Sequence, residues 1–403
     1  MRGKVAKMAR ESEKQPKPKA IIVGGSIAGV SCAHALTLAG WNVVVLEKTC
    51  APPPEAPPAP DSDSTLWLRD SSSHGWVTQI LSTKPPYRSP LIKYTTLFAL
   101  SMNQAIDGKK IRGTLTRDEN LNFRAAHWAD LHGLLYNALA EDVFLWGHLF
   151  LSFSISDDKS CVKVKSKVLE TGEIIETVGD LLVAADGCLS AIREHFLPDL
   201  QLRYSGYCAW RGVLDFSENE NSETIQGMRR AYPDLGKCLY FDLGSGTHSG
   251  IYELLNKRMN WLWYVNQPQP EMKGKSVTMK VSSDMIEKMH QEAEMAWAPE
   301  LVRVMKETKE PFLNAIYDSV LGKCLEKWGV ENLSSALEEY QSTRLPVTSK
   351  QVLHARRLGR LKQGLILADR EPFDPKTASL EDCEELQQKN MPFFADIPLP
   401  LNS

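Results

Sequence analysis

Hydrophobic positions near the start of the chain switch from a continuous run to helical spacing and back. Ala20 to Val23 form an apolar run, which is typical of a strand buried on both faces. Small and apolar residues then recur at helical spacing from Ile27 to Leu38, and a second apolar run over 42–46 ends in Glu47. The pattern predicts a strand, a glycine turn, a helix and a second strand.

The turn of this unit has the chemistry of a dinucleotide site. Gly24 provides the tight turn, a small residue at Ser26 lets the backbone approach a pyrophosphate, and Gly29 allows close packing of helix on strand. The helix N-terminus favours a phosphate anion, and Glu47 can accept hydrogen bonds from a ribose diol. An ordinary strand-to-helix turn is the alternative, because Ser26 replaces the middle glycine. The candidate cofactor-binding residues are Gly24, Gly25, Ser26, Ile27, Ala28, Gly29, Glu47 and Lys48; FAD and NAD both remain open.

A second helical spacing runs from Arg124 to Leu139, with Trp128, Leu131 and Leu135 on one face. Arg124 at its start could reach a pyrophosphate, or it could be a solvated arginine at a helix end. His127 and His132 are five positions apart, which is wrong for a shared metal on one helical face, so we expect surface histidines.

Short apolar runs then predict strands over 143–146, 149–155, 161–165 and 174–178, which form a small antiparallel layer. A further buried strand over 179–184 leads into Asp186-Gly187 and a helix. A carboxylate at the carboxyl end of a strand lies where open α/β sheets bind ligands. An isolated Asp-Gly can also be a simple turn.

Aromatic strands over 204–212, 239–243 and 260–265 indicate a second sheet whose large side chains form either a pocket wall or a core. The glycine-rich stretch 244–250 predicts a hairpin rather than a second nucleotide site, because strand-like residues follow it. Helical patterns cover about 283–307, 319–328 and 334–344, the last ending before Pro346. We expect the tail from Arg370 to be a poorly packed extension.

Composition adds limits to this picture. A chain of 403 residues predicts two domains, and a net charge of −3 gives no electrostatic footprint for nucleic acid or a membrane surface. The eight cysteines lack metal-ligand spacing and suggest reduced thiols of a cytoplasmic protein, although a weak organellar address stays open. No metal site and no membrane span are predicted. Residues 1–18 suggest a disordered basic arm, and the proline-rich stretch 51–60 suggests a spacer or, as the alternative, a ligand for a proline-binding domain.

The order of these motifs resembles that of the FAD-dependent aromatic hydroxylases of the para-hydroxybenzoate hydroxylase type, and most of all the dihydroxypyridine hydroxylase-like branch. The likeness rests on the glycine turn, Glu47, Arg124, the stretch 185–193 and the strand 204–212. It implies FAD as cofactor, NADH or NADPH as co-substrate, and hydroxylation of a small aromatic or planar ring with O2. It places Arg124 near the pyrophosphate or flavin, Phe150 beside the adenine, and Asp186 and Gly187 on FAD and the nicotinamide. We name no catalytic side chain, because in this chemistry the cofactor carries the difficult step.

The chain departs from the family at one point. Members carry a strand followed by Gly-Asp-Ala-Ala-His, whose Asp holds the ribityl chain, whereas here 312–318 continues directly into Ser319. The stretch 365–369 is a poor replacement, because it lacks the glycine and lies after the third helix. A missing segment would leave backbone groups unpaired and the flavin exposed, so any residual activity should be uncoupled from product formation.

The expected fold class is α/β, with a Rossmann-like three-layer domain for FAD or NAD(P) and a mixed, mainly antiparallel β-sheet substrate domain. The expected limits are 19–75, 116–202 and a truncated 301–346 for the FAD-binding domain, 76–115 and 203–300 for the substrate domain, and 347–403 for a C-terminal helix and tail. The alternative to an active oxygenase is a catalytically impaired relative that binds FAD weakly or not at all. A nicotinamide dehydrogenase is disfavoured by the Asp-Gly motif and the lack of an acid/base set.

Overall fold

The computed structural model describes residues 17–52, 65–69, 95–107, 109–119, 121, 123–271, 276–319 and 331–387. The chain divides into two compact units, the first made of residues 1–50 and 140–185 and the second of 51–139 and 186–403. The proline-rich stretch beyond residue 52, the predicted helix after Ser319, most of the basic arm and the last sixteen residues lie outside the described residues.

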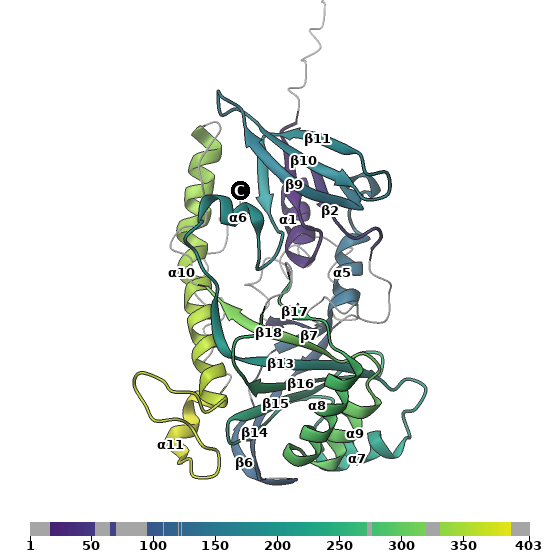
Figure 1. Ribbon diagram of the computed structural model, residues 1–403, viewed down its shortest axis with the longest axis vertical. Helices are drawn as coiled ribbons and strands as arrows, with labels where there is room; N and C mark the ends of the chain where they lie inside the picture. The colour runs from purple at the N-terminus through teal and green to yellow at the C-terminus, as the bar shows by residue number, and fades with distance from the viewer. Residues whose placement is uncertain are drawn as a thin grey trace, which may run out of the picture. The chain divides into compact units, whose positions relative to one another are not determined.

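The first unit contains a parallel sheet in the order β12-β1-β2-β8, of which Figure 1 labels β2 beside the helix α1. Its elements are β1 (Lys19–Val23), α1 (Ile27–Leu38), β2 (Asn42–Glu47), the short 3₁₀ helix η1 (Glu141–Val143), β8 (Phe144–Trp146) and β12 (Leu181–Ala184). Ala20 to Val23 are buried, since α1 and a second layer of strands both contact β1. The predicted strand, turn, helix and strand are therefore confirmed.

Three antiparallel strands form the second layer of this unit. They are β9 (His148–Ile155), β10 (Val162–Val168) and β11 (Ile174–Gly179), and β10 lies in the middle. The layer packs through β9 on β2 and through β11 on β1. At Gly179 an added Cβ would lie 2.9 Å from Ile21 Cγ1, which explains why this crossing uses glycine. Three of the four strands predicted for the antiparallel layer are thus confirmed. The expectation for 143–146 is wrong, because β8 pairs in parallel with β2 in the first sheet.

The second unit is built on an eight-stranded mixed sheet in the order β17-β18-β13-β16-β15-β14-β5-β6. The strands are β5 (Leu100–Asp107), β6 (Lys110–Asp118), β13 (Arg203–Asp215), β14 (Cys238–Gly244), β15 (Thr247–Leu254), β16 (Arg258–Asn266), β17 (Thr278–Met279) and β18 (Phe312–Asp318). All neighbouring pairs are antiparallel except β14 with β5. The expected fold class, with a mainly antiparallel second sheet, is confirmed.

Three helices cover one face of this sheet: α7 (Glu223–Ala231), α8 (Ser283–Ala296) and α9 (Pro299–Glu307) (Figure 1). Trp210, Trp261 and Trp263 point into the apolar core beneath them. Many of the predicted aromatic strand residues are therefore core residues. The single helix expected over 283–307 is two helices, because the chain is extended at Trp297 and Ala298 before Pro299 begins α9. The stretch 244–250 contains a hairpin closed between Gly244 and Thr247, as predicted.

The helix expected from residue 124 is wrong in its first four positions. Phe123–His127 forms β7, which pairs with β3 (Thr65–Arg69) and β4 (Thr96–Phe98), and α5 starts only at Trp128 and runs to Tyr136. The tertiary pairing of β7 overrides the local helical spacing. His127 and His132 are 3% and 1% exposed, so the expectation of surface histidines is also wrong.

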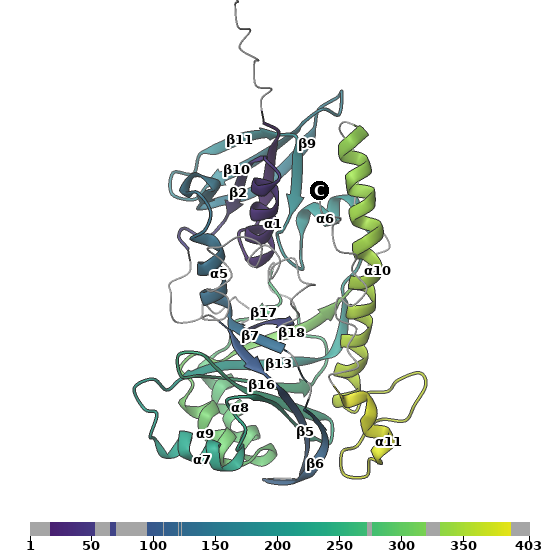
Figure 2. The same ribbon diagram turned by 180° about the vertical axis from the view of Figure 1, so that it is seen from behind.

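The long helix α10 (Glu331–Lys362) continues past Pro346, which contradicts the predicted end. Proline removes one backbone donor, but a long helix retains its other hydrogen bonds, and the Thr348 hydroxyl donates to the carbonyl of Arg344 at 3.0 Å. The end of α10 packs against β13 in the second unit, and Figure 2 shows this region beside β5 and β6.

Residues 370–387, the described part of the tail, are packed rather than loose, so the expectation of a poorly packed extension is wrong there. They include the short helices α11 (Leu380–Cys383) and η2 (Glu384–Leu386). Phe373, Cys383 and Leu386 are at most 5% exposed and join Leu358 and Leu361 of α10 in one apolar cluster. Apolar side chains spaced along an acidic stretch therefore anchor it. The remaining short helix of the unit, α6 (Ala191–Phe196), follows Asp186.

Candidate cofactor site

The glycine turn between β1 and α1 has the backbone that a phosphate site needs. Gly24 has a φ of +102°, which favours glycine, and its N–H donates to the carbonyl of Leu46 at 2.9 Å. Ser26 is the extended N-cap of α1, yet its side chain forms no capping hydrogen bond, and the first turn contains no acidic residue. The positive end of α1, with Ile27, Ala28 and Gly29 in its first turn, is not neutralised by a carboxylate of that turn.

Close packing makes two of the glycines obligatory. A Cβ at Gly29 would lie 1.9 Å from the carbonyl oxygen of Gly24, and one at Gly25 would lie 2.8 Å from Cε1 of Phe144. Either side chain would push the turn open. The ring of Phe144 in β8 therefore packs against the turn at Gly25. The sequence did not predict this contact, because Phe144 comes 119 positions after Gly25 in an ordinary apolar strand.

Glu47 is held against this turn at the carboxyl end of β2. Its Oε2 accepts a hydrogen bond from the Gly25 N–H at 2.6 Å, and its Oε1 accepts one from the Thr49 N–H at 2.9 Å. The two backbone donors fix the carboxylate where a diol could share it. Lys48, the next residue, is exposed. The structure thus brings together the six residues of the turn and Glu47.

The Asp-Gly motif begins where β12 ends. β12 pairs in parallel with β1 up to Val23 and Ala184, and the Ala185 N–H donates to the carbonyl of Val23 at 2.8 Å. Asp186 is the next residue and begins the second segment of the second unit. Its Oδ2 accepts from the Ala191 N–H at 2.9 Å, while Oδ1 is buried without a hydrogen-bond partner among the described residues. Gly187 has a φ of +89°, which a larger residue would rarely adopt.

These features fit the nucleotide half of a dinucleotide cofactor. The turn excludes side chains where a pyrophosphate would need backbone N–H groups, and a fixed carboxylate is available for a ribose. A metal has no comparable support, because no cluster of three potential ligands occurs in the described part of the chain.

Two further candidates stay predictions. Arg124 lies in β7 of the second unit instead of at a helix start, and its Nη1 donates to Thr95 Oγ1 at 3.2 Å. Phe150 lies in β9 of the first unit, half-buried and opposite Ser166 of β10.

The chain after β18 does not supply the missing motif within the described residues. β18 ends at Asp318, whose carboxylate pairs with Arg203 at 2.5 Å and with Arg356. The stretch 365–369 forms a turn closed by a bridge between Leu367 and Arg370, not a strand. In the described part of the first sheet β12 has β1 as its one partner, so its other edge is open there.

No family model matches the chain. Aurachin C monooxygenase/isomerase of Stigmatella aurantiaca is 26% identical over 260 residues, which cover 59% of this chain; the chain spans 64% of that relative's length. 2,6-Dihydroxypyridine-3-hydroxylase of Arthrobacter nicotinovorans superposes with a TM-score of 0.67 at 15% identity, over 90% of this chain and 96% of that one. HpxO of Klebsiella pneumoniae, solved with FAD and uric acid, gives a TM-score of 0.65 at 16% identity, over 86% and 89% of the two chains.

The chain therefore resembles FAD-dependent monooxygenases in sequence and has the fold of the FAD-dependent aromatic hydroxylases. The resemblance to FAD-dependent aromatic hydroxylases that was inferred from the motifs is confirmed at the level of the fold.

Proposed function

We propose that this chain is an FAD-dependent monooxygenase that uses NAD(P)H and O2 to hydroxylate an aromatic or other planar ring. The observation that carries the proposal is the Glu47 carboxylate, fixed 2.6 Å from the Gly25 N–H beside the N-terminus of α1, whose first turn contains no acidic residue. The fold likeness to dihydroxypyridine hydroxylase and to HpxO with FAD and uric acid supports the choice of cofactor and substrate class.

Each proposed contact follows from the donors and acceptors present. The N–H groups at the start of α1 would hold the pyrophosphate, Glu47 the ribose diol of the adenosine, and Asp186 a hydroxyl or N–H through Oδ1. Bound FAD would supply electron transfer from NAD(P)H and activation of O2. The protein would orient the ring and exclude water, so the proposal assigns no acid or base side chain.

A second candidate is a relative that binds FAD weakly and has lost coupled hydroxylation. It is supported by the direct continuation of β18 into Ser319 and by the open edge of β12 in the described part of its sheet. In this case part of the flavin would meet solvent, and reducing equivalents would be lost as hydrogen peroxide.

The test begins with the purified full chain. We expect denaturation to release FAD rather than NAD. When FAD is added to protein from which the cofactor has been removed, we expect the flavin fluorescence to be quenched on binding. Glu47→Gln should weaken this binding at least tenfold, because the ribose loses a charged acceptor. Glu141→Gln, an exposed glutamate of η1 in the same unit, is the matched control and should bind normally.

Turnover then separates the two candidates. A coupled oxygenase converts NAD(P)H, O2 and a phenolic or heteroaromatic substrate to product in equal amounts. An impaired relative binds FAD but yields hydrogen peroxide without product. A protein that binds no FAD at any concentration would contradict the proposal itself. Sequencing the transcript across Asp318 and Ser319 would show whether other forms contain the missing segment.

No helix in the described part of the chain is long and apolar enough to cross a membrane. The seven described cysteines are all free, which agrees with the proposed cytoplasmic location.

A further inference from the structure

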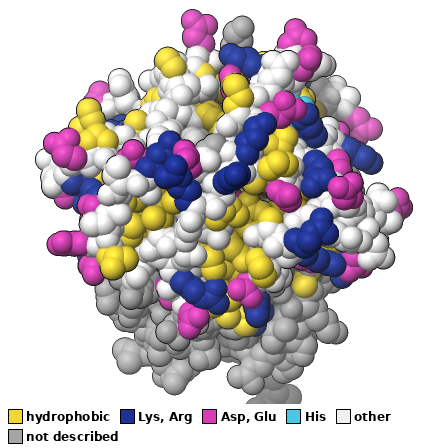
Figure 3. Space-filling model, turned by 90° about the horizontal axis from the view of Figure 1, so that it is seen from below, with side chains coloured by type: hydrophobic (Ala, Val, Ile, Leu, Met, Phe, Trp, Pro, Cys, Tyr) yellow, Lys and Arg dark blue, Asp and Glu magenta, His cyan; other side chains and the backbone are white. Residues whose placement is uncertain are grey.

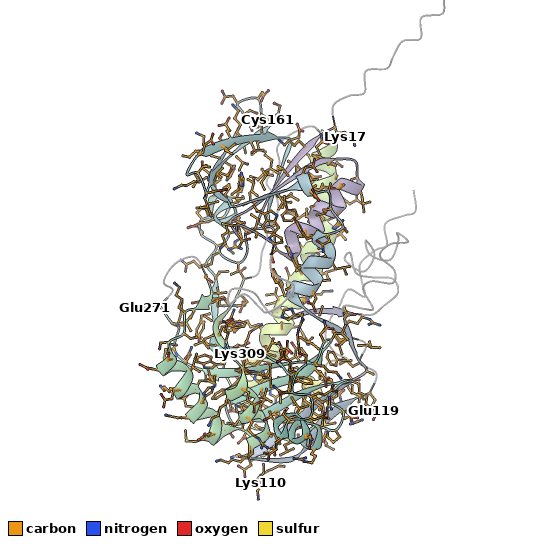
Figure 4. The ribbon with its side chains drawn as sticks, turned by 90° about the vertical axis from the view of Figure 1, so that its right-hand side faces the viewer. Lys17, Lys110, Glu119, Cys161, Glu271 and Lys309 are labelled. Atoms are coloured by element: carbon orange, nitrogen blue, oxygen red, sulfur yellow. The ribbon has the colours of Figure 1, made fainter. Side chains whose placement is uncertain are left out.

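The outward face of the antiparallel layer in the first unit carries a row of lysines. Side chains of β10 alternate, so that Val162 and Val164 are buried while Lys163, Lys165 and Lys167 are exposed. Because residues two apart in a strand share a face, the three ammonium groups form one line. Cys161, labelled in Figure 4, directly precedes this strand.

Apolar side chains flank the row on both neighbouring strands. The register places Leu149 of β9 and Ile174 of β11 opposite Lys167, and Val178 of β11 opposite Lys163. Their exposed fractions are 37%, 61% and 44%, and Leu151, at a bulge in the pairing of β9 with β10, is 44% exposed. Large apolar side chains gathered on one face in this way indicate an interaction surface.

The charge of this face is positive. No ion pair between described residues includes the three lysines. Glu176 lies opposite Lys165, and the residues facing outward on β9 at this level are Ser152 and Ser154. The central rows therefore carry a local excess of positive charge, although the whole chain has a net charge of −3.

We propose that this face, formed by Leu149, Leu151, Lys163, Lys165, Lys167, Ile174 and Val178 and here called the lysine face, docks on the surface of an anionic lipid bilayer. The apolar side chains would enter the boundary between headgroups and acyl chains, and the lysines would extend along it to reach phosphates. Each lysine near an anionic membrane strengthens binding by about fivefold.

The same charges argue against other occupants. Two copies of the chain could pack their lysine faces together around a two-fold axis at Lys165. Lys163 of one copy would then lie over Lys167 of the other, and the like charges would repel. An acidic protein would satisfy the lysines but would leave Leu149, Leu151 and Ile174 without an apolar counterpart. The face seen in Figure 3 differs, since side chains of both charge signs are mixed there among apolar ones.

The test is co-sedimentation of the full chain with vesicles at low and high ionic strength. One set contains phosphatidylcholine alone, and the other contains equal parts of phosphatidylcholine and phosphatidylserine. We expect binding to the second set that weakens with salt. Replacing Lys163, Lys165 and Lys167 together by Gln should weaken it about a hundredfold. The matched control replaces Lys237, Lys288 and Lys306, three exposed lysines of the second unit, by Gln and removes the same charge.

A second variant tests the apolar contribution. Ile174→Ser with Val178→Ser keeps all lysines and should weaken vesicle binding by at least tenfold, because two apolar side chains no longer enter the interface. Thermal melts verify that every variant is folded. The proposal is overturned if the full chain does not bind anionic vesicles, or if it binds only an acidic polypeptide. It is also overturned if the control triple variant loses as much vesicle binding as the lysine-face variant.

Discussion

Asp242 should make the second unit less stable as the pH rises from about 4 to about 7. This residue of β14 is 1% exposed; its Oδ2 accepts a hydrogen bond from the Tyr232 hydroxyl at 2.6 Å, and its Oδ1 is buried without a hydrogen-bond partner among the described residues. Burial raises the pKa of Asp242 from 3.8 to about 7, against the opposing effect of the Tyr232 hydrogen bond. The folded unit therefore favours the neutral acid.

The sign and size follow from linkage. Because the folded state binds this proton more tightly than the unfolded chain, the free energy of unfolding falls as the pH rises from about 4 to about 7 and is level above that. A shift of about three pKa units corresponds to about 4 kcal/mol. Asp242→Asn is neutral at every pH. Relative to the parent, it should gain about 4 kcal/mol of unfolding free energy between pH 4 and pH 8.

The measurement is urea unfolding of both proteins at several pH values, followed by tryptophan fluorescence, with the difference between them plotted against pH. Asp234→Asn is the control: Lys237 lowers the pKa of Asp234, so its stabilising effect is lost as the pH falls, the opposite slope. A difference between Asp242→Asn and the parent that is flat from pH 4 to pH 8 would refute the reasoning.

Three further changes test the packing. Gly29→Ala should lower the melting temperature and weaken FAD binding, because its Cβ would lie 1.9 Å from a backbone oxygen. Gly113→Ala is the control and should alter neither, because nothing lies within 4 Å of a Cβ at that position. Arg258→Met should lower the free energy of unfolding in urea by about 3 kcal/mol, because it leaves the carboxylate of Asp130 buried without its partner. The two groups lie 2.7 Å apart and both side chains are 10% exposed. An unchanged urea midpoint would contradict this. Leu386→Ser should lower the melting temperature and speed proteolysis of the tail, as this side chain is 0% exposed; a tail cleaved equally fast in the parent would argue against it.

The sequence predicted those elements whose signals are local. The turn at Gly24, the alternation in β10 and the hairpin closed between Gly244 and Thr247 each depend on residues within a few positions of one another. Each has a side-chain or backbone requirement that few residue types satisfy. These elements are therefore visible before any tertiary contact is known.

The errors come from distant partners. Arg124 lies in a strand because β3 and β4 pair with that segment, and neither pairing is visible in its own spacing. His127 is buried beside Asp130 and Arg258, and burial lowers its pKa to about 4, so it is not a surface group. Phe144 was not predicted at the candidate cofactor site for the same reason, since only the folded sheet brings its ring close to Gly25.

The pairing of β1 with β12 has a consequence for synthesis. Lys19 and Asp180 are 161 positions apart, yet their backbones meet at the start of this pair. A nascent chain that has only β1, α1 and β2 exposes one apolar strand edge until β12 leaves the ribosome, which takes about ten seconds or more at ordinary elongation rates. During that interval the edge is open to wrong partners, so production of this protein should depend on chaperone supply more steeply than its final stability suggests.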